Sequence, residues 1–117
     1  MKTIEELKQE TDFPFLITDH EGLIVYVNDS FRSVFGWEED EILGQPLEAV
    51  IPDSFHDSHH LGFSRFAMTE QSRVLNHPLK LKAVRRDGSE IEAEHYITAE
   101  KIEGSWMFAA TLRPLSE

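Results

Sequence analysis

The sequence FPFLITDHEGLIVYVN, residues 13–28, contains two apolar runs separated by a short polar turn. Phe13–Asp19 and Leu23–Val27 are rich in β-branched and aromatic residues, which favour β-strands. His20-Glu21-Gly22 lies between them, and glycine can adopt the positive φ that tight turns need. The stretch therefore predicts a β-hairpin, which needs further strands or a helix packed against it to be stable.

Helices are predicted on both sides of this hairpin. After it, Asn28 or Asp29 is placed to cap a helix that contains Phe31 and Phe35 at helical spacing. Gly36 follows, and glycine commonly ends a helix. The other helices predicted from spacing and from their capping or stop residues are Thr3–Gln9, Glu38–Leu43, Leu47–Ile51 and Ser54–Met68.

Three more strands are predicted in the second half of the chain, at Val74–Val84, Glu90–Thr98 and Ser105–Leu112. The middle one alternates, with one side formed by Ile91, Ala93, His95 and Ile97. Pro78 cannot donate a hydrogen bond to a neighbouring strand, so its strand is expected at a sheet edge. Two strands, a run of helices and three strands predict an α+β fold, with a five-stranded antiparallel sheet and short helices on one face.

Composition limits the classes of function. The chain has 117 residues, which suits one domain, and it has no cysteine. Disulfides, thiolate metal sites and a cysteine nucleophile or photo-adduct are therefore excluded. The net charge of −11 argues against binding to nucleic acid or to anionic membranes. No apolar run approaches the ~20 residues that span a bilayer, so we expect a cytoplasmic protein or the cytoplasmic piece of a larger one.

These elements, with their motifs in this order, resemble the PAS family over about Phe13 to Arg113. The residues that carry the resemblance are Ile17-Thr18-Asp19, Gly22-Leu23-Ile24, Tyr26-Val27-Asn28, Phe31, Gly36-Trp37, Glu41-Ile42-Leu43-Gly44-Gln45, Ile51-Pro52 and Arg85-Arg86-Asp87-Gly88-Ser89. The resemblance implies strand order 2-1-5-4-3. It also implies an N-terminal flanking helix at residues 1–12, a PAS domain at 13–114 and the start of a C-terminal linker at 115–117.

Most of these motif residues are expected to determine the fold rather than to contact a ligand. Asn28 should cap the helix after the hairpin, and Asp19 should bond main-chain amides in the turn. Gly36 should serve a helix end, and Arg86-Asp87-Gly88 should form a hairpin turn.

The segment at residues 52–66 is similar to the haem-binding PAS oxygen sensors, and this similarity implies a haem b site. His59 falls on the position of their proximal iron ligand, and Arg65 on that of an arginine that contacts a haem propionate. His77 falls where some members supply a sixth ligand. Leu79 stands where those sensors carry an arginine that bonds oxygen, so that contact is in doubt here.

Chemistry agrees in part with this haem site. Imidazole is a standard axial ligand of haem iron, and arginine can pair with a carboxylate bidentately. Gly62 lies on the same predicted helix face as His59 and would let a flat macrocycle approach the main chain. The remaining residues expected around the pocket are Phe63, Phe66, Leu75 and Leu79.

Other readings of the histidines remain open. His59 could bond a main-chain carbonyl at the edge of the core, with His56 and His60 in solvent. The three histidines also have a spacing that can meet one zinc ion, but no carboxylate or thiolate is clearly placed to complete the site. The pocket could instead hold another small ligand. A flavin is a weaker candidate, because without cysteine its light-driven adduct cannot form.

The predicted function is that of a sensory module, and we expect no catalysis within the chain. No buried carboxylate pair, catalytic triad or phosphate-binding loop is evident. The family's architectures imply an output domain such as a histidine kinase or a diguanylate cyclase. The alternative is a cofactor-free module for dimerisation, with a homodimer contact through Ile4 and Leu7. Those residues could instead merely cover the outer face of the sheet.

Overall fold

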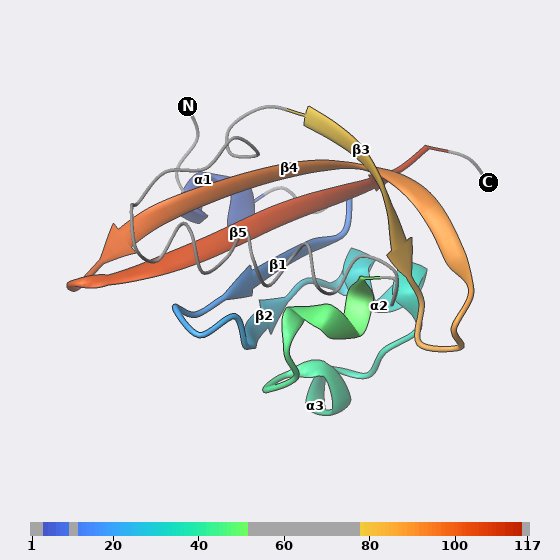
Figure 1. Ribbon diagram of the computed structural model, residues 1–117, viewed down its shortest axis with the longest axis horizontal. Helices are drawn as coiled ribbons and strands as arrows, with labels where there is room; N and C mark the ends of the chain where they lie inside the picture. The colour runs from blue at the N-terminus through green and yellow to red at the C-terminus, as the bar shows by residue number, and fades with distance from the viewer. Residues whose placement is uncertain (1–3, 10–11, 52–77, 116–117) are drawn as a thin grey trace.

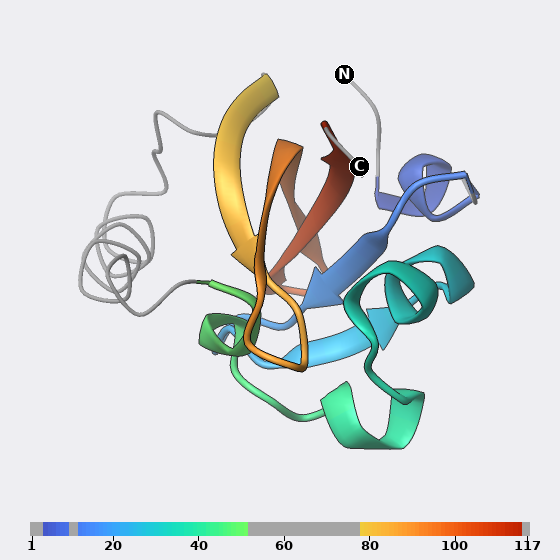
Figure 2. The same ribbon diagram turned by 90° about the vertical axis from the view of Figure 1, so that its right-hand side faces the viewer.

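The computed structural model describes residues 4–9, 12–51 and 78–115. Its strands form one five-stranded antiparallel sheet in the order β2-β1-β5-β4-β3 (Figure 1). The strands are β1 (Phe15–Thr18), β2 (Ile24–Val27), β3 (Pro78–Val84), β4 (Glu90–Ile102) and β5 (Ser105–Pro114). This confirms the predicted fold class and strand order. Figure 2 shows the strong twist of the sheet: β3 runs nearly upright in that view, whereas β2 runs nearly across it.

The described helices are all short: α1 (Ile4–Lys8), α2 (Asp29–Phe35), α3 (Glu39–Ile42) and the 3-10 helix η1 (Leu47–Val50). The predicted helix Leu47–Ile51 is thus a 3-10 helix in the structure and not an α-helix. The amide of Ala49 donates to Pro46 and the amide of Ile51 donates to Glu48, so both bonds have the three-residue spacing of a 3-10 turn. The predicted helix Ser54–Met68 lies outside the described residues.

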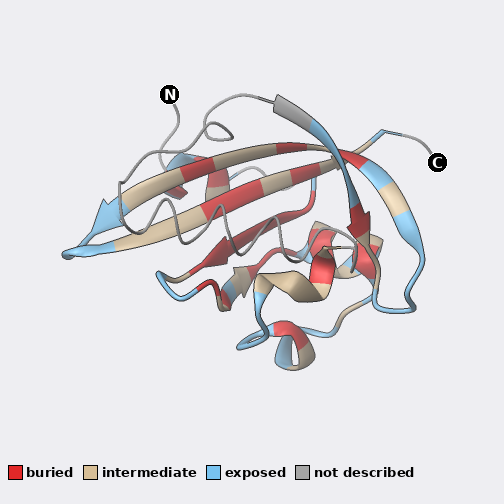
Figure 3. Cartoon of the chain, in the orientation of Figure 1, coloured by how far each residue is buried: buried red, intermediate tan, exposed pale blue. Residues whose placement is uncertain are grey.

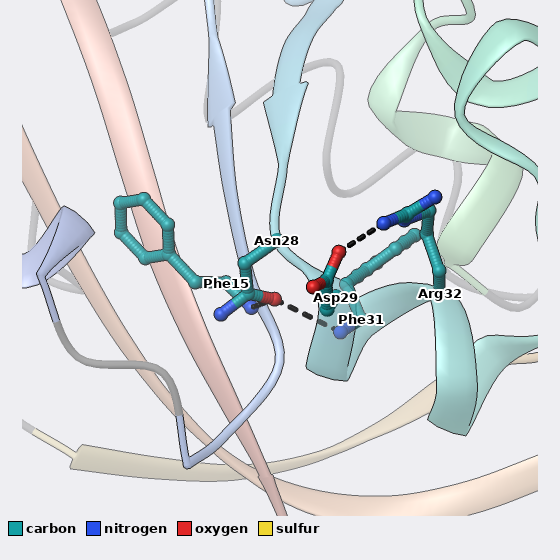
Figure 4. A network of polar contacts seen from close by, with 5 residues as sticks. All are labelled: Phe15, Asn28, Asp29, Phe31 and Arg32. Atoms are coloured by element: carbon teal, nitrogen blue, oxygen red, sulfur yellow. Dashed lines mark hydrogen bonds and ion pairs between the residues drawn. The ribbon is translucent and has the colours of Figure 1, made fainter.

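Asn28 fixes the junction between the hairpin and α2 (Figure 4). Its Oδ1 accepts hydrogen bonds from the amides of Phe15 (3.1 Å) and Phe31 (2.9 Å). Its Nδ2 donates to the carbonyl of Phe13 at 2.9 Å. The predicted cap is confirmed, and the same side chain also ties the start of β1 to the end of β2.

Two turns have the structure that the motifs predicted. Oδ1 of Asp19 accepts hydrogen bonds from the amides of Glu21 (2.9 Å) and Leu23 (3.0 Å) between β1 and β2. Between β3 and β4, the amide of Arg85 donates to the carbonyl of Ser89 at 2.8 Å. Asp19 and the Arg85–Ser89 turn therefore support the fold, as expected.

The β3–β4 turn is also bound to the helices. The amide of Arg86 donates to the carbonyl of Phe35 at 2.8 Å, and its guanidinium lies 2.7 Å from the carboxylate of Glu41. Nε of Arg85 donates to the carbonyl of Val34 at 3.2 Å. These contacts hold the β3–β4 hairpin against α2 and α3.

The face of the sheet that packs against α2, α3 and η1 is called the inner face here. Directly paired residues of an antiparallel sheet point to the same side, so the register assigns every strand residue to a face. The buried side chains of this core are Leu16, Ile24, Val27, Phe31, Phe35, Ile42, Val50, Ala83, Ala110 and Leu112. The rings of Phe31 and Phe35 stack with their centroids 4.8 Å apart.

The opposite, outer face carries α1. Ile4 and Leu7 are buried in a second cluster with Phe15, Ile17 and Ala109. The amide of Ile4 donates to the carboxylate of Glu100 on β4 at 3.0 Å. The structure therefore agrees with the reading in which Ile4 and Leu7 cover the outer face.

Strand boundaries differ from the prediction mainly in the β4–β5 hairpin. β4 continues to Ile102, past the expected end at Thr98, because β5 pairs with it up to Ile102 opposite Ser105. The turn consists of Glu103 and Gly104, both with positive φ. Between Phe108 and the turn, none of the other described strands pairs with this ribbon, and its tip is exposed (Figure 3).

Pro78 begins β3, which pairs with β4 on one side only. The predicted edge position is therefore confirmed. The upstream part of the predicted strand, residues 74–77, lies outside the described residues.

Candidate functional site

Most of the residues predicted to bind a cofactor cannot be placed. The positions outside the described residues are His59, Gly62, Phe63, Arg65, Phe66, Leu75 and His77. Leu79 is described as part of β3, where it pairs with His95 of β4. The assignment of the iron ligands therefore stays a prediction, and the candidate site rests on the inner face of the sheet.

The inner face of β3, β4 and β5 is an apolar wall. The register places on it Leu81, Ala83, Ile91, Ala93, His95, Ile97, Ala99, Phe108, Ala110 and Leu112. Figure 3 shows buried residues gathered in β1 and in the central parts of β4 and β5. Four of these positions carry the small side chain of alanine. Leu81 points to this face and yet is 43% exposed, so the wall is incompletely covered at its β3 side.

His95 is the polar residue at the centre of this wall. The residue is 9% exposed, and its buried Nε2 has no hydrogen-bond partner among the residues that the structure describes. Burial lowers the pKa of His95 to about 4, while a hydrogen bond with the main chain of Leu81 opposes that shift. The imidazole is therefore neutral at pH 7.

Thr18 is a second polar residue on the inner face, at the end of β1. It pairs with Phe108 of β5 and is 1% exposed, and its Oγ1 has no hydrogen-bond partner within the described part of the chain. A buried polar atom without a partner costs about 1–3 kcal/mol. His95 and Thr18 are therefore the described inner-face positions where a ligand could satisfy an unpaired polar atom.

Sequence reasoning placed His95 correctly on the apolar side of its strand but did not select it as a site residue. The signal was present, because it is the one titratable side chain in the alternation of Ile91, Ala93 and Ile97. The sequence analysis selected His59 on the predicted helix Ser54–Met68 instead.

An open groove lies between η1 and the β3–β4 turn. Its lining residues are Gln45, Pro46, Glu48, Ala49, Ile51, Val84 and Gly88, and its volume is about 510 Å³. The groove is open to solvent and includes none of the unpaired polar atoms described above. It is therefore a weaker candidate for the site than the inner face.

Metal ligands do not cluster in the part of the chain that the structure describes. Within residues 4–9, 12–51 and 78–115, no three side chains among histidine, cysteine, aspartate and glutamate could hold one ion. His56, His59 and His60 lie outside these residues, so this result does not address the zinc alternative. None of the helices within the same ranges is both long and apolar enough to span a membrane.

The family follows from comparison with known proteins. The model of the PAS fold matches residues 3–110. The chain belongs to the PAS family. PAS domains are in general sensory modules, so the signalling role predicted from the motifs is supported at the level of the family.

Curated relatives of this PAS domain are much longer proteins. An uncharacterised protein of Azorhizobium caulinodans is 29% identical over 103 residues, which are 87% of this chain and 14% of the relative. The sensor protein FixL of Bradyrhizobium diazoefficiens is 24% identical over 102 residues, 87% of this chain and 20% of the relative. The chain thus spans a fifth or less of the length of these two relatives.

Solved structures share the fold at low sequence identity. A PAS domain from Desulfitobacterium hafniense has a TM-score of 0.74 at 16% identity and covers 95% of this chain and 99% of its own. The PAS domain of an HTR-like protein from Haloarcula marismortui has a TM-score of 0.68 at 24% identity, covering 96% and 88%. The LOV domain of a blue-light activated histidine kinase from Erythrobacter litoralis has a TM-score of 0.66 at 12% identity, covering 92% and 100%.

Proposed function

We propose that this PAS domain is the sensory module of a signalling protein and acts by binding rather than by catalysis. Its ligand or cofactor lies between the inner face and the predicted helix Ser54–Met68. The observation that carries this proposal is the apolar wall with His95 buried at its centre, where its Nε2 finds no hydrogen-bond partner among the described residues. Ligand pockets combine such apolar lining with a few placed polar groups.

The signal passes from the inner face to the outer face through β5. Ala110 of β5 faces the inner wall, whereas its neighbour Ala109 packs with Ile4 and Leu7 of α1. A ligand that shifts β5 therefore also shifts the surface against which α1 packs. Packed elements of this kind tend to respond by moving between discrete arrangements.

The partner in this proposal is an output domain, such as a histidine kinase or a diguanylate cyclase, in a longer protein. The relatives support it, because one is a sensor protein of which this chain matches 20%. A structural neighbour also comes from a histidine kinase. We place the PAS domain at residues 13–114, with a flanking helix before it and a linker from residue 115, in the cytoplasm.

Haem b is the cofactor that we propose for the site. His59 would hold the iron, Arg65 a propionate, and His77 the sixth coordination position. The described wall fits a flat, largely apolar ring, because Ala93, Ala99 and Ala110 are small and no charged side chain occupies the inner-face positions between Ile91 and Ala99. Bound haem would supply an iron that can bind a diatomic gas or change its redox state.

A cofactor-free dimerisation module is the alternative. A homodimer through the outer face would require α1 to offer apolar surface to a second copy of the chain. Ile4 and Leu7 are each 4% exposed within one chain, so a homodimer through α1 would need other residues or a displaced helix.

An absorption spectrum tests the cofactor proposal. The purified domain is titrated with haemin, and we expect a sharp Soret band that His59→Ala removes. His56→Ala is the matched control, because it changes a neighbouring histidine that is not proposed to bind iron. A haemin spectrum unchanged by the protein would overturn the haem proposal and favour the dimerisation module.

A further inference from the structure

The helix α1 connects two strands that are not neighbours in the sheet. At its first residue, the amide of Ile4 donates to Oε1 of Glu100 on β4 at 3.0 Å. At its last residue, Nζ of Lys8 lies 4.6 Å from the centroid of the Tyr26 ring on β2. Strands β5 and β1 lie between β4 and β2. With its side chains, α1 therefore reaches across four strands of the outer face.

The Glu100 end of this connection lies where the sheet has only two paired strands. β1 pairs with β5 as far as Phe108, whereas Glu100 pairs with Met107, one residue closer to the turn. From that pair to the pair of Ile102 and Ser105, β4 and β5 are the described strands that remain. Figure 1 shows this end of the ribbon projecting past β1. A two-stranded ribbon is marginally stable alone, so its contacts with other elements matter.

The helix α1 and this ribbon end, residues 100–107, support each other. A helix of five residues is not stable in isolation. The first amides of a helix have no partner within it, and Glu100 supplies one to the amide of Ile4. Met107, opposite Glu100, packs against the cluster in which Ile4 and Leu7 are buried. One hydrogen bond to a carboxylate and one apolar contact thus join the two elements.

We propose that α1 and the ribbon end form one cooperative unit, with the Glu100 carboxylate as the latch between them. The unit opens while the central strands stay folded, as local units of other proteins do. A contact that displaces the ribbon end then releases α1, and displacement of α1 loosens the ribbon end by the same coupling free energy. This device requires no ligand on the inner face, so it goes beyond the proposed function and does not depend on it.

Native-state hydrogen exchange of the ligand-free chain, followed by NMR at low urea concentrations, tests the unit. The protected amides of α1 and of residues 100–107 should open with one common free energy and one common dependence on urea. Both should open more readily than the amides of Ile17 and Ala110 in the central strands. Two distinct opening free energies would overturn the proposal, and so would α1 amides without protection.

Variants of Glu100 test the latch itself. Glu100→Ala should speed exchange about tenfold in α1 and in the ribbon end alike, because it removes a hydrogen bond to a charged group. Glu100→Gln keeps an acceptor oxygen and should have a smaller effect. Glu92→Ala is the matched control, since Glu92 is an exposed carboxylate on the same face of β4, and it should change neither element.

The remaining outcomes of these variants are also decisive. Faster exchange in α1 alone after Glu100→Ala would overturn the coupling to the ribbon end. Unchanged exchange in both elements, or an equal effect of Glu92→Ala, would overturn the latch. If Glu100→Ala fails to fold, the common opening free energy of the wild-type chain still decides whether the two elements form one unit.

Discussion

At the scale of single residues, a few polar side chains determine how the chain folds around the inner face. Asn28 makes three hydrogen bonds that join β1, β2 and α2. His95 differs, because its buried Nε2 has no hydrogen-bond partner in the described ranges. Asn28 therefore stabilises the fold through its bonds, whereas burial of His95 carries a cost.

Asn28→Ala should lower the free energy of unfolding by about 2–4 kcal/mol. It removes a helix cap, worth about 0.5–2 kcal/mol, and leaves the buried amide of Phe15 unpaired, which costs about 1–3 kcal/mol more. Asn28→Asp should cost less, since its carboxylate still accepts from both amides. Urea unfolding measures the loss, with the exposed Asp29→Asn as control. Equal stability of Asn28→Ala and wild type would contradict the bonding described here.

His95 should make the ligand-free domain sensitive to acid. Its pKa is about 4 in the folded chain against 6.5 ordinarily, so the unfolded chain binds a proton first as pH falls. The contribution is fully present above pH 6.5 and is lost towards pH 4. It amounts to about 3 kcal/mol, at about 1.4 kcal/mol for each pKa unit.

Unfolding in urea at several pH values checks this dependence. His95→Leu should remove the part of the slope between pH 6.5 and 4, while His20→Gln, an exposed position, should leave it unchanged. A slope that persists in His95→Leu would assign the acid sensitivity to other groups.

At the scale of elements, the sequence predicted most of the described secondary structure because local signals and tertiary packing agree there. The turn glycines, the Asn28 cap and the edge proline each act within a few residues. The end of β4 was missed because pairing with β5 extends it past Thr98. The 3-10 form of Leu47–Val50 was missed because apolar spacing does not distinguish it from a short α-helix.

The candidate site was harder to predict than the elements. Alternation placed His95 on the inner face, but its unpaired nitrogen depends on which atoms of other strands approach it. Such contacts have no local signal in the sequence. The histidines of the predicted long helix lie outside the described residues, so that part of the site stays a prediction.

Gly36 gives an element-scale prediction at the end of α2. Its φ of 80° lies in the left-handed region, which a Cβ disfavours by about 1–2 kcal/mol. Space is not the constraint, because a Cβ there would lie 3.8 Å from its nearest neighbour, Cβ of Arg86. Gly36→Ala should therefore lower stability by about 1 kcal/mol, and Gly36→Asn by less. If thermal unfolding showed Gly36→Asn to be less stable than Gly36→Ala, this account would be contradicted.

At the scale of the whole molecule, the sheet separates two apolar clusters, one under α2, α3 and η1 and one under α1. The second cluster is small and is closed by a helix of five residues. A helix this short is not stable alone, so its position depends on the side chains that it buries.

Leu7→Ala should lower the free energy of unfolding by about 2–3 kcal/mol and loosen α1 on the outer face. Glu5→Ala, at an exposed position of the same helix, is the matched control. Thermal unfolding measures the loss, and sedimentation shows whether the uncovered outer face makes two copies associate. Unchanged stability would mean that α1 does not depend on this contact in solution.

The tip of the β4–β5 ribbon has a practical consequence. Glu103 and Gly104 lie in an exposed turn that β1 and β3 do not reach, so a short peptide or a fluorescent label inserted there would disturb little else. Such a label would lie at the end of β4 and β5, the two strands at the centre of the apolar wall. Its signal could report a bound molecule by fluorescence, without any output domain attached.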